Sequence, residues 1–176
     1  MNIETERIKL RKLRISDADF IRQNAEDRKI TKYTNVVSSS IGARNAEKFI
    51  KRIQKEWKKK TAFEFGIELK KSKKLIGAID LSDIDCKNKN ASVGFWLVKK
   101  YWSKGLAEEA LRLILSFGFK KLKLKRIQAR VFHKNKNAQK LLEKLGFKLE
   151  GRLRKKTFFR NQWFDDLIYG ILKDEY

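Results

Sequence analysis

The residues best suited to chemistry are Lys104 and Gly105, which stand between a strand-like and a helix-like segment. Residues 91–97 place every second side chain on one apolar face, and residues 107–117 repeat apolar side chains at helical spacing. A strand that passes through a glycine-containing loop into a helix presents backbone N–H groups and the positive end of the helix dipole to an anion. The arrangement therefore predicts a site for a phosphorylated cofactor.

The same loop also has a plainer interpretation. Gly105 suits an ordinary surface turn that needs an unusual backbone angle. The sequence contains neither the G-x-x-x-x-G-K-[ST] phosphate loop nor the G-x-G-x-x-G dinucleotide fingerprint. A second segment, NKNAQKLLEKLGF at 135–147, lies further along the chain and favours the cofactor interpretation.

The elements that must position this loop alternate between strand and helix patterns. Apolar side chains at alternate positions predict strands at 8–13, 62–69, 75–81, 92–98, 126–132, 147–153 and 167–172. Helical spacing predicts one helix from Ser16, as its N-cap, and others over 46–57, 107–117 and 138–145, the last ended by Gly146. Residues 82–90 are polar and predict a loop. Residues 1–176 are expected to form a single mixed α/β domain.

Together the two segments resemble the GNAT superfamily of N-acetyltransferases, and the resemblance covers nearly the whole chain. In that superfamily a strand, a Q/R-x-x-G-x-G/A loop and a helix bind the pyrophosphate of acetyl-CoA. Gly105 and Ala107 match this loop, whereas Trp102 replaces its usual Gln or Arg. The run YWSKGLAEEAL at 101–111 and the E-K-x-G-F that ends at Phe147 are similar to the branch that includes the ribosomal-protein N-terminal acetyltransferases.

The resemblance implies a GNAT-like α/β fold with a mixed, mostly antiparallel sheet and helices on both faces. Its fourth strand, here 92–98, splays away from its fifth, here 126–132, and the pantetheine arm of acetyl-CoA enters the gap. The backbone of 96–98 is then expected to pair with the arm, the N–H of Leu97 to stabilise the oxyanion, and 104–107 to hold the pyrophosphate. The full set implied to bind the cofactor is Trp96, Leu97, Val98, Trp102, Ser103, Lys104, Gly105, Leu106, Ala107, Asn135, Ala138 and Leu142. Asn135 also fits a helix-entry turn without any ligand.

The positions that relatives use for proton transfer are changed in this chain. Leu142 stands where many relatives have a Tyr acid, and Ala138 where the ribosomal-protein branch has a Ser. Thr157 and Ser92 occupy positions at which relatives carry a Glu. Either water and positioning suffice, or a base comes from elsewhere. The candidates for that base are Glu64, Asp80, Asp83, Asp85 and His133.

The missing base bears on the identity of the acceptor. At pH 7 about a tenth of an α-amine with a pKa near 8 is neutral, against well under about one part in a thousand of a lysine or polyamine amine. The leading hypothesis is an acetyl-CoA-dependent N-acetyltransferase that modifies a protein N-terminus, as in ribosomal-protein acetylation. The alternatives are a small-molecule amine acceptor, such as a polyamine or aminoglycoside, and a non-catalytic protein that binds CoA or RNA. Acceptor-binding loops are expected at 35–42, 82–90 and 155–163.

Charge and composition limit the other partners. Forty-four Lys and Arg against 21 Asp and Glu give a net charge of +23, which predicts either weak association with polyanions such as the ribosome or a solvated, lysine-rich surface. Cys86 and His133 are single residues of their types, so neither a disulfide nor a metal site is expected. No apolar run is long enough to span a membrane, and a cytoplasmic location is expected. The aromatic residues Phe158, Phe159 and Trp163 predict either a homodimer surface or core packing.

Overall fold

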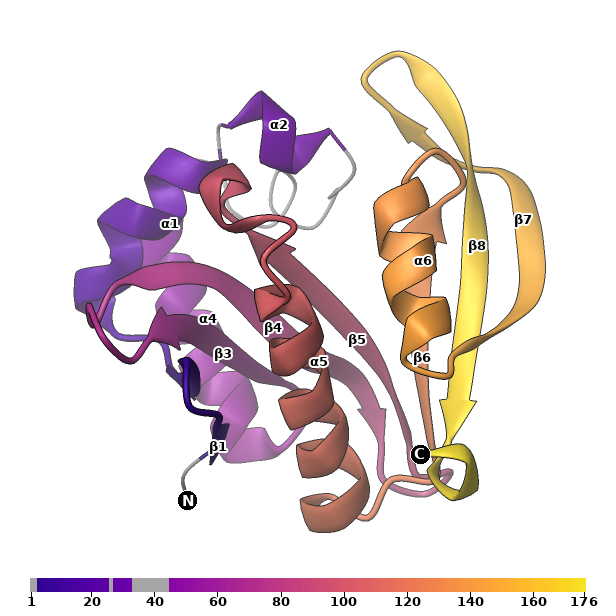
Figure 1. Ribbon diagram of the computed structural model, residues 1–176, viewed down its shortest axis with the longest axis horizontal. Helices are drawn as coiled ribbons and strands as arrows, with labels where there is room; N and C mark the ends of the chain where they lie inside the picture. Colours follow the sequence, from indigo (N-terminus) through magenta and orange to yellow (C-terminus); the bar gives the residue numbers. More distant parts are fainter. Residues whose placement is uncertain (1–2, 26, 33–44) are drawn as a thin grey trace.

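One sheet of eight strands, in the order β1-β2-β3-β4-β5-β6-β8-β7, runs through the molecule (Figure 1). It is seen in a computed structural model that describes residues 3–25, 27–32 and 45–176. The strands are β1 (Ile3–Glu4), β2 (Ile8–Lys12), β3 (Phe63–Leu69), β4 (Leu75–Asp85), β5 (Asn90–Leu97), β6 (Arg126–Phe132), β7 (Lys148–Phe159) and β8 (Gln162–Leu172). Neighbouring strands are antiparallel except β5 and β6, which are parallel.

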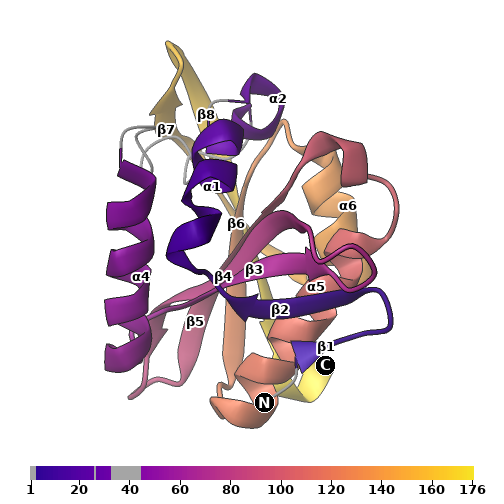
Figure 2. The ribbon, with the colours of Figure 1, turned by 90° about the vertical axis from the view of Figure 1, so that its left-hand side faces the viewer.

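Helices cover both faces of this sheet. They are α1 (Ala18–Ala25), α2 (Arg28–Thr31), α4 (Ala46–Lys59), α5 (Leu106–Ser116) and α6 (Lys136–Lys144). Figure 2 shows α1 and α4 on one face and α5 and α6 on the other. Ile21 and Ile50 are fully buried on the first side, and Leu111 and Ile114 on the second. The expected mixed, mostly antiparallel α/β fold is therefore confirmed. None of the helices described is both long and apolar enough to cross a membrane.

Strands β5 and β6 separate soon after they begin. They pair only through residues 90–92 and 126–128. Beyond this point β5 continues along β4 as far as Leu97, and β6 continues along β8 as far as Phe132. Figure 1 shows the two strands diverging toward α2 and the start of α6. The expected splay is confirmed, and it leaves one edge of β5 without a partner among the strands that the structure describes.

The first helix starts differently from the sequence expectation. Residues Ile15–Asp17 form a 3-10 turn ahead of α1, so Ser16 is not an N-cap. The carboxylate of Asp17 instead accepts a hydrogen bond from the N–H of Arg14 at 2.7 Å. The N-cap of this turn is Arg14, and Asp17, its third residue, bonds back to the N-cap N–H as the acidic residue of a capping box does.

Two segments predicted as loops are mostly strand. β4 runs on to Asp85 and β5 starts at Asn90, so only 86–89 remain of the loop expected at 82–90. Most of 155–163 belongs to β7 and β8, which are joined by Arg160 and Asn161 at φ values of 49° and 56°, as in a tight hairpin turn. Polar side chains on the exposed ends of these strands conceal the alternation. The third expected acceptor loop, 35–42, lies outside the described residues.

Gly77 in β4 sets how closely β5 can approach. A Cβ built at this position would lie 2.1 Å from the carbonyl oxygen of Trp96. Gly77→Ala should push β5 outward and lower the free energy of unfolding by about 1–3 kcal/mol, as measured by denaturant titration. Gly151→Ala is the matched control in β7, because no atom of the described residues lies within 4 Å of a Cβ there. Equal stability of the two variants would contradict the close approach of β4 and β5.

Candidate active site

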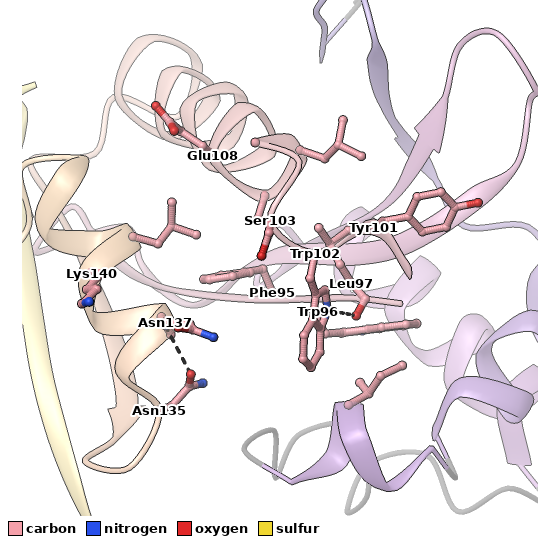
Figure 3. Close-up of a pocket in the computed structure, with 16 residues that line it drawn as sticks. Phe95, Trp96, Leu97, Tyr101, Trp102, Ser103, Glu108, Asn135, Asn137 and Lys140 are labelled. Carbon is pink, nitrogen blue, oxygen red and sulfur yellow. Dashed lines mark hydrogen bonds between the residues drawn. The ribbon is translucent and has the colours of Figure 1, made fainter. Parts of the chain in front are cut away.

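A pocket opens where β5 and β6 have separated, between the start of α5 and the start of α6 (Figure 3). It encloses about 370 Å³. Among the residues predicted to bind the cofactor, those that line it are Trp96, Leu97, Trp102, Ser103, Gly105, Leu106, Ala107, Asn135 and Ala138. Val98, Lys104 and Leu142 are not among the residues that line it.

The open edge of β5 turns backbone groups toward this pocket. The N–H of Val98 donates to the carbonyl of Ile76 at 2.9 Å, which fixes the alternation of the antiparallel ladder between β4 and β5. Two residues back, the backbone groups of Trp96 therefore point toward β4. Those of Phe95 and Leu97 point the other way, into the gap between β5 and β6.

The position of Leu97 fits its expected role. Its carbonyl accepts a hydrogen bond from Trp102 Nε1 at 2.7 Å (Figure 3), and in an extended strand its N–H points to the same side. The expectation that the backbone of Trp96 and Val98 pairs with the cofactor is wrong. Trp96 faces β4, and both backbone groups of Val98 are taken, its N–H by Ile76 and its carbonyl by the N–H of Tyr101 at 2.9 Å.

The loop between β5 and α5 presents N–H groups that have no partner inside the helix. Gly105 is the N-cap of α5, with φ of 77° and no side chain to cap the helix. The first helical bond runs from the N–H of Glu109 to the carbonyl of Gly105 at 3.1 Å. The N–H groups of Leu106, Ala107 and Glu108 precede that bond, and all three residues line the pocket. This arrangement suits phosphate groups.

The opposite wall is the first turn of α6. The side chain of Asn135 caps this helix by accepting a hydrogen bond from the N–H of Ala138 at 3.2 Å, and both residues line the pocket. Asn135 is thus a helix-entry residue and a pocket residue at once. The expectation that Leu142 contacts the cofactor is wrong, because its side chain is fully buried in the core beneath α6.

Several residues that line the pocket were not predicted from the sequence. They are Ile30, Phe95, Tyr101, Glu108, Asn137, Lys140 and Leu141. Helical spacing could have found Asn137 and Leu141, which lie one turn apart beside Ala138. Strand alternation could have found Phe95, two residues before Leu97. Nothing in the sequence pattern connects Ile30 in α2 with the site.

Comparison with known proteins decides the family. The family model described as "Acetyltransferase (GNAT) domain" matches residues 7–148. The chain is 34% identical over 174 residues to the uncharacterized N-acetyltransferase p20 of Bacillus licheniformis, with 98% of this chain and 96% of p20 covered. This chain belongs to the GNAT acetyltransferase family. As a GNAT protein it is an N-acetyltransferase, and acetyl-CoA is its cosubstrate.

Two other similar proteins are named for different acetyl acceptors. The GNAT chain is 28% identical over 134 residues to YdaF of Bacillus subtilis, provisionally named a ribosomal N-acetyltransferase, with 75% of this chain and 73% of YdaF covered. The structure of spermidine N-acetyltransferase from Vibrio cholerae in complex with CoA and spermine has the same fold, with a TM-score of 0.84, 24% identity, and 97% and 98% of the two chains covered. The site fits the cosubstrate, because the β5 edge and the α5 N-terminus turn backbone N–H donors toward the pocket.

Two carboxylates lie side by side on the other face of this GNAT sheet. Glu64 of β3 is the register partner of Asp80 of β4, on the face that α1 and α4 cover. The Asp80 carboxylate reaches across to β5, since a Cβ built at Gly94 would lie 2.7 Å from Asp80 Oδ1. The structure therefore brings together two of the five candidate bases, beside the splayed strand.

The environment of this pair disfavours ionisation. Burial, together with the charges of Asp83 and Glu56, raises the pKa of Asp80 to about 7. Burial and the charge of Asp80 raise the pKa of Glu64 to about 8, although Arg52 opposes the shift. Both carboxyl groups thus exchange protons close to neutral pH.

Of the three other candidate bases, Asp83 does not line the pocket, and Asp85 and His133 hold loops in place. Asp85 accepts a hydrogen bond from the N–H of Asn88 at 2.8 Å in the turn between β4 and β5, and hydrogen bonds from that turn lower its pKa. His133 Nδ1 accepts a hydrogen bond from the N–H of Asp165 at 3.1 Å. Neither residue lines the pocket.

Replacing Gly105 tests the phosphate-binding loop. Ala at φ of 77° costs about 1–2 kcal/mol of backbone strain, so Gly105→Ala should turn the first N–H groups of α5 and weaken CoA binding about tenfold in calorimetry. Gly146→Ala is the matched control, because Gly146 has φ of 89° at the end of α6, away from the pocket. Equal losses of CoA affinity in the two variants would rule out a specific role of this loop.

Asp80→Asn tests the acidic pair through stability. Because the pKa of Asp80 is raised in the folded protein, its contribution to stability is complete below about pH 4 and is lost as the pH rises through about 7. The melting temperature of Asp80→Asn relative to the unsubstituted protein should therefore increase between pH 5 and pH 8. Asp85→Asn, at an exposed carboxylate with a lowered pKa, should show no such gain. A pH-independent difference for Asp80→Asn would contradict the raised pKa.

Proposed function

We propose that this GNAT protein transfers the acetyl group of acetyl-CoA to the α-amine at a protein N-terminus. One observation carries the proposal. Among the described residues that line the pocket, Glu108 is the single carboxylate, and hydrogen bonds from Lys144 and Arg112 hold its pKa below the ordinary value. A pocket wall whose one carboxylate is a weakened base suits an amine that is already partly neutral at pH 7, which favours an α-amine over a lysine or polyamine amine.

The chain's contribution to this reaction is positioning and charge stabilisation. Acetyl-CoA supplies the acetyl thioester. The N–H of Leu97 donates to the oxygen on which negative charge develops, at the edge of β5 that diverges from β6. The N–H groups at the start of α5 hold the phosphates, and the gap between β5 and β6 aligns the two reactants.

Similarity and charge support a macromolecular acceptor. The provisional name of YdaF is that of a ribosomal enzyme. The net charge of +23 would draw this protein toward the ribosome, a polyanion whose proteins carry N-terminal amines. Both points agree with the neutral-amine argument.

An acceptor panel tests the proposal. With labelled acetyl-CoA, kcat/KM for peptides with a free N-terminus should exceed that for spermidine by at least about tenfold, because more of the α-amine is neutral. The control is the same peptide with a blocked N-terminus and an internal lysine, which should take up no label. Transfer to spermidine or to the blocked peptide alone would overturn the proposal.

The acidic pair favours a second candidate, a polyamine acceptor. Glu64 and Asp80 exchange protons close to neutral pH, so a cationic amine beside them would favour their ionised forms and be held by them. Similarity to the Vibrio cholerae spermidine N-acetyltransferase, whose structure contains spermine, supports the same acceptor. The panel separates the two candidates, since a polyamine enzyme would prefer spermidine to every peptide.

A further inference from the structure

Arg7, in the turn between β1 and β2, reaches the cofactor loop from outside the pocket. Its Nη1 donates to the carbonyl of Lys104 at 3.1 Å, and its Nε donates to Glu109 Oε1 at 2.6 Å. Thr5 of the same turn donates its hydroxyl to Glu109 Oε2 at 2.6 Å. The guanidinium also lies over Gly105, because a Cβ built there would be 3.2 Å from Arg7 Nη2. The turn before β2 thus holds the loop before α5.

The need for this contact follows from the charge at the start of α5. Glu108 and Glu109 both lie in the first turn of the helix, where a carboxylate occupies the field that would otherwise attract a phosphate. An unpaired carboxylate there would also repel the phosphates of acetyl-CoA. Glu108 is neutralised by Lys144 at 2.6 Å and Arg112 at 3.1 Å, and Glu109 is neutralised by Arg7.

We propose that Arg7 is a positioning residue of the acetyl-CoA site. It cancels the charge of Glu109 and draws the carbonyl of Lys104 outward, so that N–H groups rather than a carbonyl face the phosphates. The guanidinium is suited to this task because its fork reaches two acceptors at once, which a lysine ammonium does less well. The inference rests on acetyl-CoA as cosubstrate and is independent of the acceptor.

The location of Lys104 agrees with this role. Its residue type suggests a direct phosphate contact, but its ammonium lies 5.9 Å from the centre of the Tyr101 ring, and the residue does not line the pocket. Its backbone carbonyl, in contrast, is fixed by Arg7. The loop therefore depends on a cation that is remote in sequence.

The test is binding of CoA to Arg7→Gln by calorimetry, with no acceptor present. The dissociation constant should rise about tenfold, the effect expected when a first-turn charge is left uncompensated. In an NMR titration, pantetheine, which lacks the pyrophosphate, should bind to Arg7→Gln as it does to the unsubstituted protein. Arg126→Gln is the matched control, because Arg126 forms a comparable ion pair with Glu150 outside the pocket and should leave CoA binding unchanged.

A double variant separates charge from structure. Arg7→Gln with Glu109→Gln removes both charges and should recover most of the CoA affinity, whereas Arg7→Lys should bind with intermediate affinity. The proposal is overturned if Arg7→Gln binds CoA normally, if it loses pantetheine affinity to the same extent, or if the double variant does not recover. Melting temperatures of all variants identify general unfolding. Unfolding would lower the affinities for CoA and pantetheine together and count against the proposal.

Discussion

The parallel pairing of β5 and β6 ends after three residue pairs, and the active site depends on that ending. Backbone N–H and C=O groups in a folded protein need partners. Those of Phe95 and Leu97 face none of the strands that the structure describes, although β4 holds the other edge of β5 in an extended conformation. The open edge of β5 can therefore form backbone hydrogen bonds with an extended ligand that has amide groups, as a sheet edge does with a peptide.

A second constraint acts at the start of α5. A helix N-terminus attracts phosphate, but here the first turn also carries two carboxylates. Lys144 on α6 and Arg7 before β2 each neutralise one of them from another element of the fold. The ion pair between Glu108 and Lys144 also joins the two helices that form opposite walls of the pocket. Charge neutralisation and pocket shape are therefore maintained by the same contacts.

Much of the fold and the cofactor side of the site followed from sequence. Strand alternation and helical spacing located β6, α5 and α6 closely, and the loop at Gly105 lies where a phosphate site was expected. Two kinds of information were absent from those patterns. Which backbone groups of β5 face the gap depends on its register with β4, which is why Val98 was wrongly assigned.

Contacts between segments that are distant in the sequence were the second kind of information that the sequence patterns lacked. Arg7 meets Lys104 and Glu109 only because β2 packs near the start of α5, and no local pattern encodes that meeting. Glu64 and Asp80 likewise come together through the pairing of β3 with β4. Leu142 was included because relatives carry a Tyr acid at its position, whereas here its side chain is fully buried in the core.

Amide hydrogen exchange, followed residue by residue with and without CoA, tests the role of the β5 edge most directly. In the free protein the N–H groups of Trp96 and Val98 should be protected by β4, and those of Phe95 and Leu97 should exchange quickly. CoA should slow exchange at Phe95 and Leu97 and leave Trp96 and Val98 unchanged. Rapid exchange at Phe95 and Leu97 in the presence of saturating CoA would contradict the assignment of this edge as the cosubstrate's binding surface.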